Sequence, residues 1–64
     1  MNFENVISAL KDSAKHAKDY YYNAKRLWEL YPKDEMFEQR YKMASEIFCE
    51  YCLLSHKLDI ELFE

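Results

Sequence analysis

Glycine is absent from this 64-residue chain, and Pro32 is its one proline. Without glycine the backbone has few positions that adopt a positive φ easily, so the tight turns of β-hairpins are disfavoured. Pro32 also disfavours helical geometry at the residue before it, Tyr31. The chain is therefore predicted to be all-α, with its main break near Pro32.

On both sides of Pro32, apolar or small residues recur at alternating steps of four and three, which is the spacing of a coiled-coil seam. The first seam comprises Phe3, Ile7, Leu10, Ala14, Ala17, Tyr21, Ala24, Trp28 and Tyr31. The second comprises Phe37, Tyr41, Ala44, Phe48, Tyr51, Ser55, Leu58 and Leu62. Asn2 and Asp34 are suitable N-caps for the two helices. We predict a single domain over residues 1–64, with helix one over about 3–31, a turn over about 32–34 and helix two over about 35–62.

A connection this short makes consecutive helices antiparallel neighbours. If the turn is centred between residues 32 and 33, the numbers of facing seam residues sum to 65, so that Ala17 faces Phe48 and Phe3 faces Leu62. Most of these pairs set a large side chain against alanine or serine, as close packing requires. The expected fold is an antiparallel two-helix hairpin with coiled-coil-like packing.

A second apolar row runs beside the seam, on one flank of the expected hairpin. We call it the apolar row; it comprises Val6, Tyr20, Leu27, Met43, Ile47 and Leu54. A hairpin of this size has nothing of its own to cover the row, and an exposed contiguous apolar surface is typical of a protein interface. We expect the row to be a self-association surface, producing a homodimeric four-helix bundle. Binding to a different protein is the alternative, because such a partner would meet the same surplus row.

The opposite flank is basic. Lys11, Lys15, Lys18 and Lys25, with Tyr22 among them, are candidate partner contacts, since tyrosine is a common interface residue. Residues 1–33 carry six Lys and Arg against four acids, and residues 34–64 carry three against eight, so the two halves have complementary charge. We expect Lys25 to lie near Glu38. The net charge of −3 is the reverse of what nucleic-acid binding favours, and no nucleic-acid partner is expected.

Cys49, Cys52 and His56 lie near one face of helix two and form the one candidate metal or redox site. Zinc usually takes four ligands, and His16, level with Cys49, belongs to the outer face of helix one. A redox CxxC needs a helix N-terminus, which is about four turns away. We therefore interpret the two thiols as semi-buried small apolar groups and expect no metal and no cofactor; a metal-stabilised or redox-responsive module is the less favoured alternative.

Several function classes lack their motifs. The chain has no glycine-rich phosphate loop and no helical HExxH, and a small hairpin is not expected to form a hollow of the roughly 300 Å³ that ligand pockets need. No apolar run approaches the length that spans a bilayer, and the first residues lack the pattern of a signal peptide, so we expect a cytoplasmic protein with reduced thiols. The expected function is non-enzymatic protein binding through self-association. An accessory or inhibitory protein of bacterial or phage type that binds a different protein is the alternative.

Overall fold

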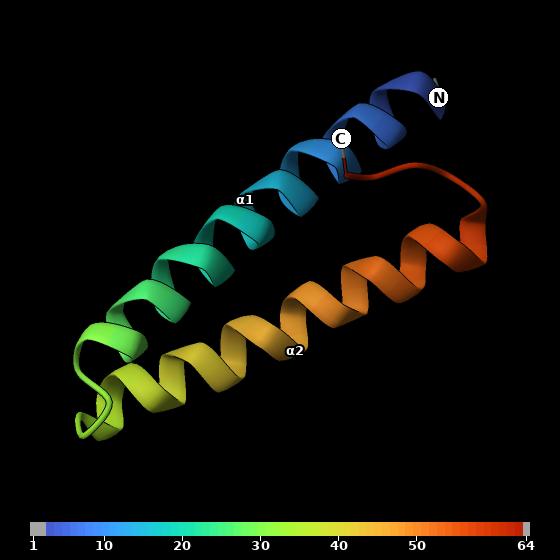
Figure 1. Cartoon of the computed structure of the whole chain (residues 1–64). Helices are drawn as coiled ribbons and strands as arrows, with labels where there is room; N and C mark the ends of the chain where they lie inside the picture. Colours follow the sequence, from blue (N-terminus) through green and yellow to red (C-terminus); the bar gives the residue numbers. More distant parts are fainter. Residues whose placement is uncertain (1–2, 64) are drawn as a thin grey trace.

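The chain folds into an antiparallel pair of α-helices. In the computed structural model, which describes residues 3–63, α1 covers Phe3–Leu30 and α2 covers Glu35–Leu58. The helices lie close together at the connecting turn and separate toward the chain termini (Figure 1). The molecule measures 46 × 18 × 17 Å, so it is little thicker than two packed helices. The predictions of an all-α class and a helical hairpin are confirmed.

The turn follows the predicted signals around Pro32. The N–H of Asp34 donates to the carbonyl of Tyr31 at 3.0 Å, which closes the turn. The Asp34 carboxylate accepts hydrogen bonds from the backbone N–H of Met36 at 2.9 Å and of Phe37 at 3.4 Å. Asp34 is therefore the N-cap of α2, as predicted, whereas Asn2 lies outside the described residues. The first helix ends at Leu30, one residue before the predicted boundary, because Tyr31 precedes proline.

The seam between the helices alternates small and large side chains. Among the described residues, the buried apolar positions of the two helices are all alanines, namely Ala14, Ala17, Ala24 and Ala44. Aromatic rings pack around them. The ring of Tyr41 lies 5.0 Å from that of Trp28 and 5.7 Å from that of Tyr21, and Tyr21 in turn stacks on Phe48 at 5.0 Å. Tyr41 thus lies between residues 21 and 28, at the level of Ala24, which agrees with the sum-to-65 alignment.

The second helix ends at Leu58, four residues before the predicted end at 62. Asp59 takes the left-handed conformation, with φ 52° and ψ 41°, and its N–H donates to the carbonyl of His56 at 3.3 Å. The N–H of Ile60 donates to the carbonyl of Ser55 at 3.1 Å. These two bonds form a Schellman-type helix end, which stops the helix even though the residue at the left-handed position is not glycine.

Beyond this cap, residues 60–63 turn back across the gap between the separating helices; we call this segment the tail (Figure 1). The hydroxyl of Ser55 donates to the carbonyl of Ile60 and accepts a hydrogen bond from the N–H of Leu62 at 3.3 Å. Leu62 is only 3% exposed, and the ring of Phe63 lies 5.1 Å from that of Phe48. The predicted seam pair of Phe3 and Leu62 is therefore wrong, and Phe3 is 82% exposed.

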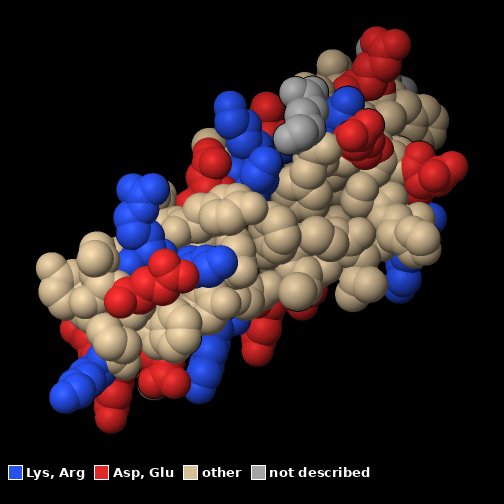
Figure 2. All heavy atoms as spheres, viewed as in Figure 1, with Lys and Arg blue, Asp and Glu red and all other residues tan. Residues whose placement is uncertain are grey.

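Charged side chains gather along both long edges of the face shown in Figure 2, with an uncharged band between them that a small group of acidic and basic side chains interrupts toward the turn. Such a distribution is what two amphipathic helices produce when their apolar stripes meet. Neither α1 nor α2, as described, contains an apolar stretch long enough to cross a bilayer.

Candidate interaction surface

The apolar row lies at the surface of the hairpin. The side chains of Val6, Tyr20, Met43 and Ile47 are exposed, with Met43 reaching 60% and Ile47 38%, and those of Leu27 and Leu54 are half-buried. Tyr20 and Leu27 are seven residues apart in α1, as are Ile47 and Leu54 in α2, so each pair follows one stripe of its helix. The described part of the chain therefore leaves the row largely uncovered.

Two further apolar residues extend the row at its turn end. Leu30 is 64% exposed and lies one turn after Leu27 in α1, while Met36 is 62% exposed and lies two turns before Met43 in α2. Residues three or seven apart share a helix face, so both belong beside the row. Sequence reasoning missed them because they occupy neither the seam nor the row itself. Their signal was helical spacing from Leu27 and Met43.

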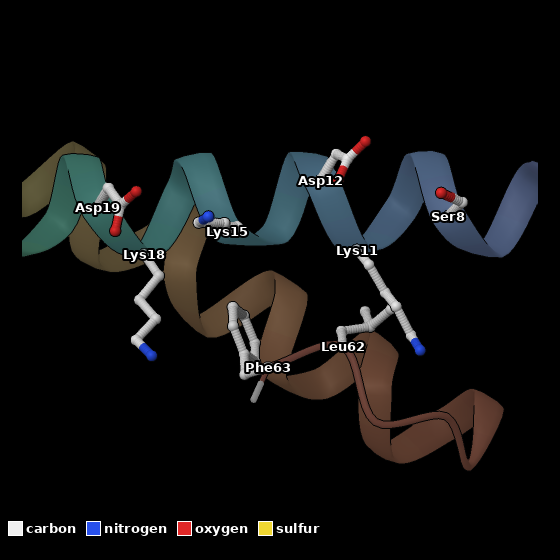
Figure 3. A pocket seen from close by; sticks show the side chains of 8 residues that line it. All are labelled: Ser8, Lys11, Asp12, Lys15, Lys18, Asp19, Leu62 and Phe63. Atoms are coloured by element: carbon white, nitrogen blue, oxygen red, sulfur yellow. The ribbon is translucent and has the colours of Figure 1, made fainter.

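The basic flank contains a hollow instead of the smooth surface that was expected. It has a volume of about 450 Å³ and is lined by Ser8, Lys11, Asp12, Lys15, Lys18, Asp19, Leu62 and Phe63. In Figure 3, Lys18 extends beside Phe63 and Lys11 beside Leu62, whereas Asp12 points away from the tail. The hollow exists because the tail folds back against α1, which the prediction of a continuous second helix did not include. The prediction that a hairpin this small forms no hollow of the size of a ligand pocket is therefore wrong.

The other residues of the basic flank differ in exposure. The side chain of Tyr22 is exposed, and its ring makes an edge contact with that of Tyr21 at 5.3 Å. Lys25 is half-buried, and Glu38 pairs with Lys42 at 3.5 Å, one turn along α2. An ion pair of this kind, between exposed groups in the same helix, stabilises the helix by only a few tenths of a kcal/mol. Among the described residues, Glu38 thus pairs within its own helix and forms no ion pair with Lys25; that Lys25 lies near Glu38 stays a prediction.

Cys49 and Cys52 are free thiols, and both are exposed, as is His56. The prediction that the thiols are semi-buried is wrong, because both residues lie away from the seam, on the outer and basic sides of α2. Within residues 3–63, no three His, Cys, Asp or Glu side chains are grouped so that they could hold a metal ion. The histidine at position 16 is exposed on α1.

Tyr21 is the ionisable residue whose environment is most clearly altered. A hydrogen bond between its side chain and that of Tyr41 raises the pKa of Tyr21 above its ordinary value of 10.0, and partial burial acts in the same direction. Both effects favour the neutral phenol. The residue is half-buried in the aromatic part of the seam, so this shift reports on packing between the helices.

Comparison of the chain with protein-family models, with curated proteins and with solved structures gives no match.

Proposed function

We propose that this protein is a small, non-enzymatic protein-interaction module that self-associates through the apolar row. The observation that carries the proposal is the exposure of Val6, Tyr20, Met43 and Ile47 along one flank of a hairpin only 18 Å thick. Covering such a row removes apolar surface from water, which stabilises the covered state by about 25 cal/mol per Å² of apolar surface buried. Closed two-fold dimers are the commonest way for a soluble chain to cover a surface of this kind.

The position of the tail also favours the flank that carries the apolar row as the interface. Leu62 and Phe63 line the hollow on the basic flank together with Lys11 and Lys18, and so they cover the side opposite the row. The apolar residues of the tail therefore do not cover the apolar row. Two hairpins packed row to row would form a four-helix bundle, in which each row becomes part of the shared core. Leu30 and Met36 would extend this core at the turn end.

The test is the molar mass in solution of the wild type and of two matched variants. We expect the wild type to have twice the chain mass of 7.9 kDa. Ile47→Lys places a charge in the row and should give a monomer that keeps its helical circular dichroism. Leu53→Lys makes the same change at a 61% exposed apolar residue of α2 outside the row and should leave the dimer intact.

Each other outcome contradicts the proposal in a defined way. A stable wild-type monomer would remove self-association and favour the alternative of a different protein partner for the row. Equal disruption by both variants would show that the row is not the interface. A dimer that dissociates when a chelator is added would instead place the association at Cys49, Cys52 and His56.

A further inference from the structure

The tail occupies one of two positions that the sequence allows. The seam spacing continues from Ser55 through Leu58 to Leu62, so the periodicity itself gives no reason for α2 to stop at Leu58. In the structure, Leu62 has left this register and is buried in the tail, where it lines a hollow together with residues of α1. Phe3, which the seam alignment pairs with position 62, is left 82% exposed. A longer α2 would bring these two side chains together if the helices, which separate toward the chain termini, also closed at this end.

The hinge between the two positions is Asp59. Among residues 3–63 it is the one non-glycine residue with positive φ, and a residue with a Cβ atom is disfavoured in that conformation. Its carboxylate also lies at the C-terminal end of α2, where negative charge opposes the helix dipole. The backbone and the charge of Asp59 therefore both act against the tail position that is observed.

Three contacts act in its favour. The Ser55 hydroxyl bonds both the carbonyl of Ile60 and the N–H of Leu62. A helix that continued to Leu62 would satisfy this N–H internally, but the carbonyl of Ile60 would be among its four terminal carbonyls that have no partner within the helix. Burial of Leu62 and the ring contact of Phe63 with Phe48 add apolar stabilisation. All three are lost together if α2 continues, so the two positions exclude each other.

We propose that residues 59–63 form a two-state strap. In the docked state the tail lies over Phe48 as observed. In the extended state α2 continues to Leu62 and the two helices close at this end, so that Leu62 takes the seam position opposite Phe3. Extension opens the basic flank beside Lys11 and Phe48. The strap lies on the flank opposite the apolar row, and its test is therefore independent of self-association.

The experiment is an NMR comparison of variants of the full chain. Asp59→Ala should raise the ratio of extended to docked states roughly tenfold, because alanine disfavours positive φ and favours helix. Asp59→Gly should lower that ratio by a similar factor. The double variant Ser55→Ala/Asp59→Ala should give helical Cα shifts at residues 59–62, lose the contact between Phe63 and Phe48, and gain one between Leu62 and Phe3.

Ser45→Ala is the matched control, since Ser45 is a half-buried serine of α2 ten residues before Ser55 and outside the strap contacts. It should leave the shifts of residues 59–62 unchanged. The proposal is overturned if these residues stay non-helical in the double variant, whether the contact of Phe63 with Phe48 is kept or lost. The contact of Trp28 with Tyr41, at the other end of the hairpin, verifies that each variant is folded.

Discussion

At the scale of single residues, alanine sets how closely the helices approach. Ala17 is almost fully buried at the level of Phe48, whose ring is already in contact with Tyr21 and Phe63. A larger side chain at position 17 has no free volume to enter, because the ring of Phe48 on the facing helix is held in place by the rings of Tyr21 and Phe63. Overpacking of a closed core usually destabilises a protein by about 1 to 3 kcal/mol.

We therefore predict that Ala17→Leu lowers the free energy of unfolding by about 1 to 3 kcal/mol in urea denaturation. Asn5→Leu is the control, because Asn5 is exposed on the same helix and belongs to neither the seam nor the apolar row, and it should change stability by less than about 0.5 kcal/mol. A neutral result for Ala17→Leu would contradict the sum-to-65 alignment.

Tyr21 provides a prediction at high pH. Its folded-state pKa is raised above 10.0, chiefly by the hydrogen bond with Tyr41, so the fold favours the neutral phenol. The stability that this provides is fully present below the unfolded pKa and is lost as pH rises through the raised folded pKa. The melting temperature should thus fall as the pH is taken above about 10.

The comparison that assigns this fall uses Tyr21→Phe and Tyr22→Phe. Tyr21→Phe should show a shallower decline of melting temperature with pH than the wild type, because it has no phenol to ionise at this position. Tyr22 is exposed, so Tyr22→Phe should follow the wild type. If both variants decline as steeply as the wild type, other groups are responsible.

At the scale of the helices, local signals predicted the turn well but not the end of α2. Pro32 and Asp34 act on neighbouring backbone groups, so their effects can be read from short stretches of sequence. The effect of Asp59 cannot be read from a short stretch of sequence, because Asp59 is neither glycine nor proline. Its left-handed conformation depends on the contacts of the tail with Ser55 and Phe48. The alternating steps of four and three residues continue through Leu62, so the sequence pattern is equally consistent with a helix that continues to residue 62. Periodicity carries no information about the competition between this longer helix and the contacts of the docked tail.

The N-cap of α2 gives a second prediction at this scale. Asp34→Ala removes the acceptor for the N–H groups of Met36 and Phe37 and should lower the free energy of unfolding by about 1 kcal/mol, measured by thermal or urea denaturation. Asp19→Ala removes an exposed aspartate from the interior of α1, where alanine is the better helix former by up to about 0.7 kcal/mol, and should therefore leave the free energy of unfolding unchanged or raise it slightly. Equal effects would show that charge, and not capping, is the cause.

At the scale of the whole molecule, the hairpin buries few of its described side chains. The apolar row was predictable because it follows from the same heptad pattern as the seam. Leu30 and Met36 were missed although their helical spacing from Leu27 and Met43 was a signal for them, because both lie next to the turn, at the end of one helix and the start of the other. The hollow beside Lys11 depends on the tail, and so it was beyond sequence reasoning for the same reason as the end of α2.

Self-association predicts that stability depends on concentration. Because a dimer is favoured by mass action, the melting temperature of the wild type should fall on about a hundredfold dilution. Ile47→Lys should melt at one temperature across that range, whereas Leu53→Lys should behave like the wild type. A wild-type melting temperature that does not change on dilution would contradict the proposed interface.

The stacking of Trp28 on Tyr41, at 5.0 Å and with ring planes only 6° apart, has a spectroscopic consequence. Trp28 is the single tryptophan of the chain, and its ring partner belongs to the other helix. Its fluorescence therefore reports on separation of α1 from α2 beside the turn and is not directly exposed to rearrangement of the tail at the far end. A change in the tail that leaves this emission unaltered, together with a change in the NMR signals of Phe63, would show that the two ends of the hairpin open independently.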